Sequence, residues 1–121
     1  MEAMRKPLVG VILLTLLVVA GAIVAFSKGA TPAPTSYEYF WGEGCPHCVV
    51  VEDFLKDWGK AEQLGLVKKE VWKSTKNANL MAQRAASCGI PKDELGVPML
   101  VTPEGKCITG DTPIIDHLKG I

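Results

Sequence analysis

The spacing of apolar residues changes along the chain, and each change predicts an element. Aromatic residues recur at every second position in Tyr37, Tyr39 and Trp41, which is the period of a strand. After residue 46 the apolar residues recur at helical spacing instead. The pattern predicts a strand at 37–41 and a helix from 46 to about 60, with an extension to 64 also allowed.

Turn signals divide the rest of the chain into further elements. Gly89 and Pro91 end one helical pattern, and Pro103 opens a hairpin turn. A strand, helix and strand at this spacing imply a parallel pair with a right-handed crossover. The expected fold class is α/β, with the order β-α-β-α-β-β-α and helices flanking a mixed four-stranded sheet. We expect the later strands at 66–72, 98–102 and 107–109, and helices at 76–88 and from Thr112 to Ile121.

The N-terminal segment carries a long uncharged apolar run from Leu8 to Phe26, preceded by Arg5 and Lys6. Its length fits a helix that crosses a bilayer, and the basic residues place the N-terminus in the cytoplasm. We therefore expect one transmembrane signal anchor at 1–27, before the α/β domain. A cleaved signal peptide, cut near Ala22, is the alternative and gives a secreted form. Both interpretations predict an extracytoplasmic domain, in the periplasm or on the outer face.

Composition narrows the domain and its partners. Residues 28–36 are small, polar and rich in proline, which is typical of a flexible linker. The domain is then 37–121, small enough for a covalent cross-link to help its stability. The 13 basic residues cancel the 13 acidic ones. Nucleic-acid binding usually needs a basic surface, so we expect no nucleic-acid partner, and we expect a monomer.

The chemistry is concentrated in Cys45-Pro46-His47-Cys48, where the first strand gives way to a helix. Proline is favoured at the first helical position. A thiolate at Cys45 faces the unpaired N–H groups and the positive end of the helix dipole, which lower a thiol pKa. A protonated His47 adds a positive charge nearby. We expect Cys45 to be the attacking nucleophile and Cys48 to resolve the mixed disulfide.

Three motifs within 37–121 resemble the thioredoxin fold in its minimal, glutaredoxin-sized form: the CPHC segment, Val97-Pro98, and Gly110-Asp111. The Pro-His pair and the valine before the proline are similar to the DsbA family of periplasmic oxidants. The compact size is similar to small domains linked to vitamin K epoxide reductase homologues. The resemblance implies a thiol–disulfide oxidoreductase that exchanges disulfides with cysteine-containing proteins, needs no cofactor or metal, and has a membrane redox partner.

The same resemblance implies that Pro98 is cis, packs against the CxxC and shapes a substrate groove. The backbone at Val97 is expected to pair with an extended substrate. Trp41 either lines this groove or packs in the core. One departure is Tyr39, which stands where thioredoxins carry a buried acid. Proton transfer to Cys48 then needs water or another group, and Glu38 and Glu43 remain the alternatives.

Cys88 and Cys107 require a separate interpretation. A small exported domain favours a structural disulfide between them, with two buried thiols or a second redox pair as alternatives. Structural zinc sites usually have two ligand pairs, so a metal site at Cys45 and Cys48 is a minor alternative. The other alternative is that the domain is a non-catalytic binding module. The direction of electron flow stays open, because Pro-His favours an oxidant whereas a membrane-fed reductase fits equally well.

Overall fold

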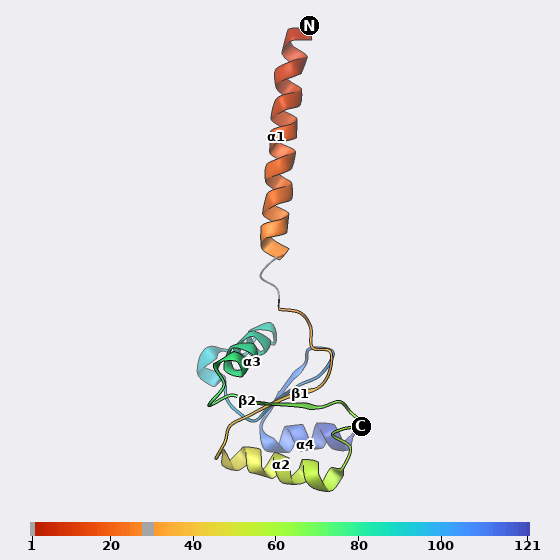
Figure 1. Ribbon diagram of the computed structural model, residues 1–121, viewed down its shortest axis with the longest axis vertical. Helices are drawn as coiled ribbons and strands as arrows, with labels where there is room; N and C mark the ends of the chain where they lie inside the picture. Colours follow the sequence, from red (N-terminus) through yellow and green to blue (C-terminus); the bar gives the residue numbers. More distant parts are fainter. Residues whose placement is uncertain (1, 28–30) are drawn as a thin grey trace. The chain divides into compact units, whose positions relative to one another are not determined.

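The computed structural model describes residues 2–27 and 31–121, and in the first range the side chains of residues 6–19. The chain divides into two compact units, which part between Thr31 and Pro32 (Figure 1). The first unit holds helix α1, Glu2–Ser27. Within it the Thr15 hydroxyl donates to the helix carbonyls of Ile12 at 2.9 Å and Val11 at 3.1 Å.

The predicted membrane-spanning helix over residues 8–26 is wrong. A helix needs about 20 consecutive, predominantly apolar residues to cross the hydrocarbon core of a bilayer. In the part of the chain that the structure describes, no helix combines that length with that apolar character. The fold class is therefore corrected: the described chain is α/β, with four α-helices and a mixed four-stranded sheet, and lacks the transmembrane element.

The second unit is built on one sheet with the strand order β2-β1-β3-β4. β1 pairs in parallel with β2 and antiparallel with β3, and β4 is antiparallel to β3. The parallel pair agrees with the sequence prediction. Strands β1–β4 are Glu38–Trp41, Val67–Glu70, Met99–Val101 and Cys107–Thr109, and helices α2, α3 and α4 are Pro46–Trp58, Thr75–Ser87 and Asp111–Lys119, with a 3₁₀ turn at Lys92–Glu94.

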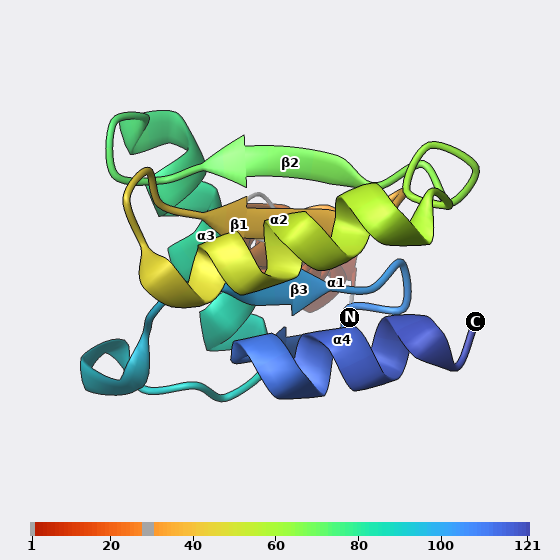
Figure 2. The same cartoon turned by 90° about the horizontal axis from the view of Figure 1, so that it is seen from below.

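Helices cover both faces of the sheet, with α2 and α4 on one face and α3 on the other (Figure 2). Successive residues of β1 supply both cores, because side chains alternate across a strand. Tyr39 joins the core under α2 and α4, and Phe40 joins the core under α3. The first core consists of Tyr39, Val51, Leu55, Leu100, Ile108, Ile114 and Leu118, and the second of Phe40, Val71, Met81, Ala85, Met99 and Val101.

Several boundaries differ from the predicted ones for local reasons. Helix α2 stops at Trp58, because Gly59 adopts φ 68° and donates its N–H to the Leu55 carbonyl at 3.3 Å. Glycine reaches this left-handed conformation without steric cost, so it ends the helix earlier than we predict. Helix α4 begins at Asp111 and not at the predicted Thr112 cap. The helix ends at Lys119, before the predicted Ile121, which is 48% exposed.

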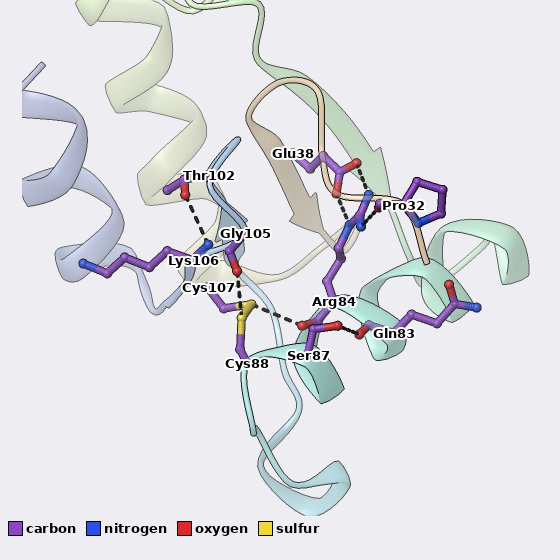
Figure 3. Close-up of polar contacts among 10 residues, drawn as sticks. All are labelled: Pro32, Glu38, Gln83, Arg84, Ser87, Cys88, Thr102, Gly105, Lys106 and Cys107. Carbon is purple, nitrogen blue, oxygen red and sulfur yellow. Dashed lines mark hydrogen bonds and ion pairs between the residues drawn. A yellow bond between two sulfur atoms is a disulfide. The ribbon is translucent and has the colours of Figure 1, made fainter. Parts of the chain in front are cut away.

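The folded unit starts at Pro32, before the Tyr37 start that we predict. Figure 3 shows why: Arg84 of α3 reaches both β1 and the preceding segment. Its Nε and Nη2 donate to the two carboxylate oxygens of Glu38 at 2.9 and 3.1 Å, and its Nη1 donates to the Pro32 carbonyl. Both charged side chains are almost fully buried. This bidentate pair attaches the segment before β1 to α3.

Candidate functional site

The CxxC segment lies at the N-terminus of α2. Cys45 is the N-cap residue, and its Sγ accepts a hydrogen bond from the backbone N–H of Cys48 at 3.2 Å. Its own N–H donates to the Gly42 carbonyl at 3.1 Å. Pro46 occupies the first helical position. Cys45 and Cys48 form a disulfide with a Cα–Cα separation of 5.2 Å, and they are only 5% and 1% exposed. The sulfur of Cys45 therefore sits where helix N–H groups point.

A second segment, from the loop before β3, closes over this disulfide. The Val97–Pro98 peptide bond is cis, and Pro98 is buried. The Val97 carbonyl oxygen lies 3.9 Å from Cys45 Sγ. The Pro98 carbonyl accepts the N–H of Gly110 at 3.1 Å, which joins the loop to the start of α4. The Val97–Pro98 segment and the CxxC lie close together because β3 begins at the end of the sheet where β1 and β4 terminate.

His47 turns toward α4. Its Nδ1 lies 2.9 Å from Asp111 Oδ2, while 74% of the His47 side chain remains exposed. This hydrogen bond, followed by the one from the Thr112 backbone N–H, lowers the pKa of Asp111. The carboxylate is thus ionised near neutral pH and partly offsets a protonated imidazole. Asp111 belongs to the Gly110-Asp111 motif, but nothing in the sequence indicated its contact with His47.

A fourth segment, after β2, contacts the turn before the CxxC. The Glu70 carboxylate accepts backbone N–H groups from Trp72 at 2.9 Å, Lys73 at 2.8 Å and Glu43 at 3.3 Å. Lys73 also forms an ion pair with the Glu43 carboxylate. These contacts join two loops that are adjacent because parallel β1 and β2 end at the same edge. The sequence predicted a strand at 66–72, but no motif in it singled out Glu70.

The two tryptophans near the site have different environments. Trp41 is partly buried and packs against the core under α2 and α4. Trp72 is 59% exposed, and its indole lies against Gly42 so closely that any Cβ there would collide with the ring. Gly42 in turn accepts the Cys45 N–H. Of the two, Trp72 is the aromatic surface next to the CxxC, and no periodicity in the sequence marked it.

The structure also locates the acids named as proton acceptors for Cys48. Glu38 is on the opposite face of β1 from Tyr39 and is held by Arg84. Glu43 is exposed and paired with Lys73. Tyr39 reaches the first turn of α2, where its hydroxyl donates to the Cys48 carbonyl at 3.3 Å. Neither acid is thus placed to serve the buried Cys48 thiol.

The other two cysteines lie at the opposite edge of the sheet. Cys88 caps the C-terminus of α3, and Cys107 begins β4. They form a disulfide with a Cα–Cα separation of 6.1 Å, and both residues are partly exposed (Figure 3). Carbonyl oxygens surround the sulfurs: Gly105 O is 3.2 Å from Cys88 Sγ, and Arg84 O is 3.5 Å from Cys107 Sγ.

The donor set at the CxxC has consequences for metal binding. Among the described residues, no group of three or more His, Cys, Asp or Glu side chains is placed to hold a metal ion. Tetrahedral zinc sites use three or four protein ligands, so Cys45 and Cys48 alone make an incomplete set.

In the comparisons with known proteins, no family model, no curated protein and no solved structure matched this chain.

Proposed function

We propose that the domain is a thiol–disulfide oxidoreductase of thioredoxin-like type, with Cys45 and Cys48 as its redox pair. The observation that carries the proposal is the N-cap position of Cys45, whose sulfur accepts the Cys48 N–H at 3.2 Å. Helix N-terminal N–H groups stabilise negative charge. A thiolate released at Cys45 therefore keeps a hydrogen bond that is already in place, which makes the disulfide easy to open.

The exchange runs through a mixed disulfide with the substrate. In the oxidising direction, a substrate thiolate attacks Cys45 Sγ, the Cys45–Cys48 bond breaks, and Cys48 leaves as a thiolate that takes up a proton. A second substrate thiolate then attacks the substrate sulfur of the mixed disulfide and releases Cys45 as the stabilised thiolate. The reducing direction reverses these steps, and the reduction potential of the couple decides between them.

The substrates that fit this site are extended, cysteine-containing polypeptides. The Val97 carbonyl, 3.9 Å from Cys45 Sγ, borders the point of attack. An extended segment pairing with the backbone there presents its cysteine to Cys45. The exposed Trp72 indole lies against Gly42, just before the CxxC, and offers an apolar contact to residues that flank the substrate cysteine. Two disulfides in one small domain are typical of an oxidising compartment, so we propose an extracytoplasmic location.

Trapping of the mixed disulfide tests the proposal directly. In a Cys48→Ala variant, Cys45 cannot be released by its partner, so a peptide disulfide should remain covalently attached to it. Mass spectrometry of tryptic fragments should locate the adduct on Cys45. The Cys45→Ala variant is the matched control and should form no adduct, and its insulin-reduction rate should fall to the uncatalysed rate. An adduct on Cys88 or Cys107, or insulin reduction that survives Cys45→Ala, contradicts the assignment.

A further inference from the structure

One partly exposed acidic residue near the CxxC, which carries a buried carboxylate oxygen, has no role in the exchange described above. Glu52 lies on α2, one helical turn after Cys48. Its Oε2 accepts a hydrogen bond from Lys68 of β2. Its Oε1 is buried, and it is the one such side-chain oxygen or nitrogen without a hydrogen-bond partner among the described residues. Buried polar atoms in folded proteins are nearly always hydrogen-bonded, so an exception calls for a physical explanation.

The surroundings of Glu52 connect it to Cys48. Residues four apart on a helix are neighbours on one face, with Cβ atoms about 5–6 Å apart. Tyr39 of β1 interacts with both: its hydroxyl donates to the Cys48 carbonyl at 3.3 Å, and its pKa is raised, first by burial and then by the nearby charge of Glu52. In register, Tyr39 is also the strand partner of Lys68. Tyr39 and Lys68 are thus the titratable groups that face Glu52 from the sheet.

The exchange reaction needs a proton acceptor at this place. Cys48 is 1% exposed, so bulk water reaches its thiol poorly. A buried thiol resists ionisation, yet only the thiolate attacks a disulfide. Glu38 and Glu43 are both engaged elsewhere. The contact with Lys68 uses Oε2 and leaves Oε1 as a free acceptor.

We propose that Glu52 is the proton acceptor and donor for Cys48, a role that rests on the proposed oxidoreductase function. During resolution of the mixed disulfide, the proton of the Cys48 thiol passes to Glu52 Oε1, directly or through one bridging water. The Cys48 thiolate then attacks Cys45 Sγ, the bond from Cys45 to the substrate sulfur breaks, and the substrate leaves as a thiolate. In the opposite direction, protonated Glu52 returns the proton to the departing Cys48 thiolate.

A chromogenic aromatic disulfide, dithiobis(nitrobenzoate), separates the two cysteines in one experiment. Attack by Cys45 of the reduced protein releases a first nitrothiobenzoate, and attack by Cys48 on the resulting mixed disulfide releases a second. The first release reports on the proposed function, and the second reports on the present inference. Stopped-flow absorbance from pH 5 to 9 resolves both phases. The Cys48→Ala variant, which can give only the first, identifies them.

Glu52→Gln should slow the second release by at least about tenfold at neutral pH, within the range of general base catalysis, and leave the first within twofold. Its second phase should rise with pH throughout, because hydroxide must now remove the proton. Asp53→Asn is the matched control: it removes the same charge from the next, exposed residue of α2 and should change neither phase. A second phase unchanged in Glu52→Gln, or slowed equally by Asp53→Asn, overturns the inference.

Lys68→Met provides an independent arm if Glu52→Gln does not fold. Loss of Lys68 removes the contact that holds the Glu52 carboxylate in place, so the second release should slow several-fold. The first release should keep its rate. A second release that keeps its rate in Lys68→Met contradicts the role of Glu52. Absence of a fast first phase in the unmodified protein refutes the oxidoreductase proposal itself, which keeps the two failures distinct.

Discussion

The two disulfides of this domain are embedded in opposite electrostatic surroundings. Cys45 Sγ accepts a backbone N–H at 3.2 Å at a helix N-terminus, and the Val97 carbonyl oxygen lies farther from it, at 3.9 Å. Cys88 stands at a helix C-terminus, and carbonyl oxygens lie 3.2 Å from Cys88 Sγ and 3.5 Å from Cys107 Sγ. N–H groups stabilise a thiolate, whereas carbonyl groups and the negative end of a helix dipole destabilise one. The surroundings therefore favour opening at Cys45–Cys48 and oppose it at Cys88–Cys107.

Burial alone gives the opposite ranking. Cys45 and Cys48 are nearly inaccessible, while Cys88 and Cys107 are partly exposed. Sequence separation agrees with the electrostatics: the first pair is 3 residues apart within one helical turn, and the second is 19 apart and joins α3 to β4. A cross-link between distant elements restricts the unfolded chain more than one within a turn does. Polar environment and loop length thus separate a bond suited to exchange from one suited to stability.

Removal of the distal disulfide tests this contrast with the largest expected effect. Cys88→Ala with Cys107→Ala should lower the free energy of unfolding by about 3 kcal/mol, since the disulfide closes a loop of roughly 20 residues. The corresponding Cys45→Ala, Cys48→Ala protein should lose about 2 kcal/mol on the same basis. Denaturant titration of both proteins measures the difference. Insulin reduction by the folded Cys88→Ala, Cys107→Ala protein should persist, and its loss would show that the distal pair takes part in the exchange.

Removal of the His47 side chain tests the electrostatic surroundings of the Cys45–Cys48 disulfide. His47→Ala should make the Cys45–Cys48 couple more reducing, because the reduced thiolate loses a stabilising cation. A shift of about 30 mV corresponds to a tenfold change in the exchange constant, and we expect a shift of this order. Equilibration with glutathione mixtures measures the potential. His117→Ala, at the far end of α4, is the matched control and should leave it unchanged. A shift toward a more oxidising couple refutes the proposed role of His47.

The smallest expected effect concerns the pair between His47 and Asp111. The hydrogen bond from His47 lowers the pKa of Asp111 from its ordinary value of 3.8. Such a group contributes stability above its unfolded pKa, and this stability is lost as pH falls through the lower folded value. Asp111→Asn should therefore be slightly less stable than the unmodified protein near pH 6, and the difference should vanish in strong acid.

Thermal unfolding across this pH range measures the Asp111 contribution. Asp116→Asn, which removes an exposed carboxylate from the same helix, should show no such pH dependence. A stability difference between Asp111→Asn and the unmodified protein that grows toward low pH reverses the sign of the argument and excludes the pair as its cause. If Asp111→Asn no longer changes the stability when it is introduced into the His47→Ala variant, the effect arises from the His47–Asp111 contact.

Local patterns in the sequence were sufficient for the elements of the folded unit. Alternation at Tyr37, Tyr39 and Trp41 predicted β1, and helical spacing after Pro46 predicted α2, because side-chain period follows directly from backbone geometry. Local patterns were not sufficient to predict the residues at which the elements end. The pattern allowed α2 to reach 60 or 64, whereas the helix ends at Trp58 because Gly59 adopts the left-handed conformation. The apolar run at 8–26 shows the same limit, since it predicted a membrane span that the structure does not support.

The candidate site shows which decisions belong to tertiary structure. The sequence by itself determined the placement of Cys45 at a helix N-cap, because strand, proline and helix follow one another along the chain. It did not determine the neighbours from distant segments: Asp111 beside His47, Trp72 on Gly42, and Lys68 on the Glu52 carboxylate. Those contacts depend on strand order and register, which bring four loops to one edge of the sheet. Such long-range pairings are set by packing of the whole core, and no local pattern encodes them.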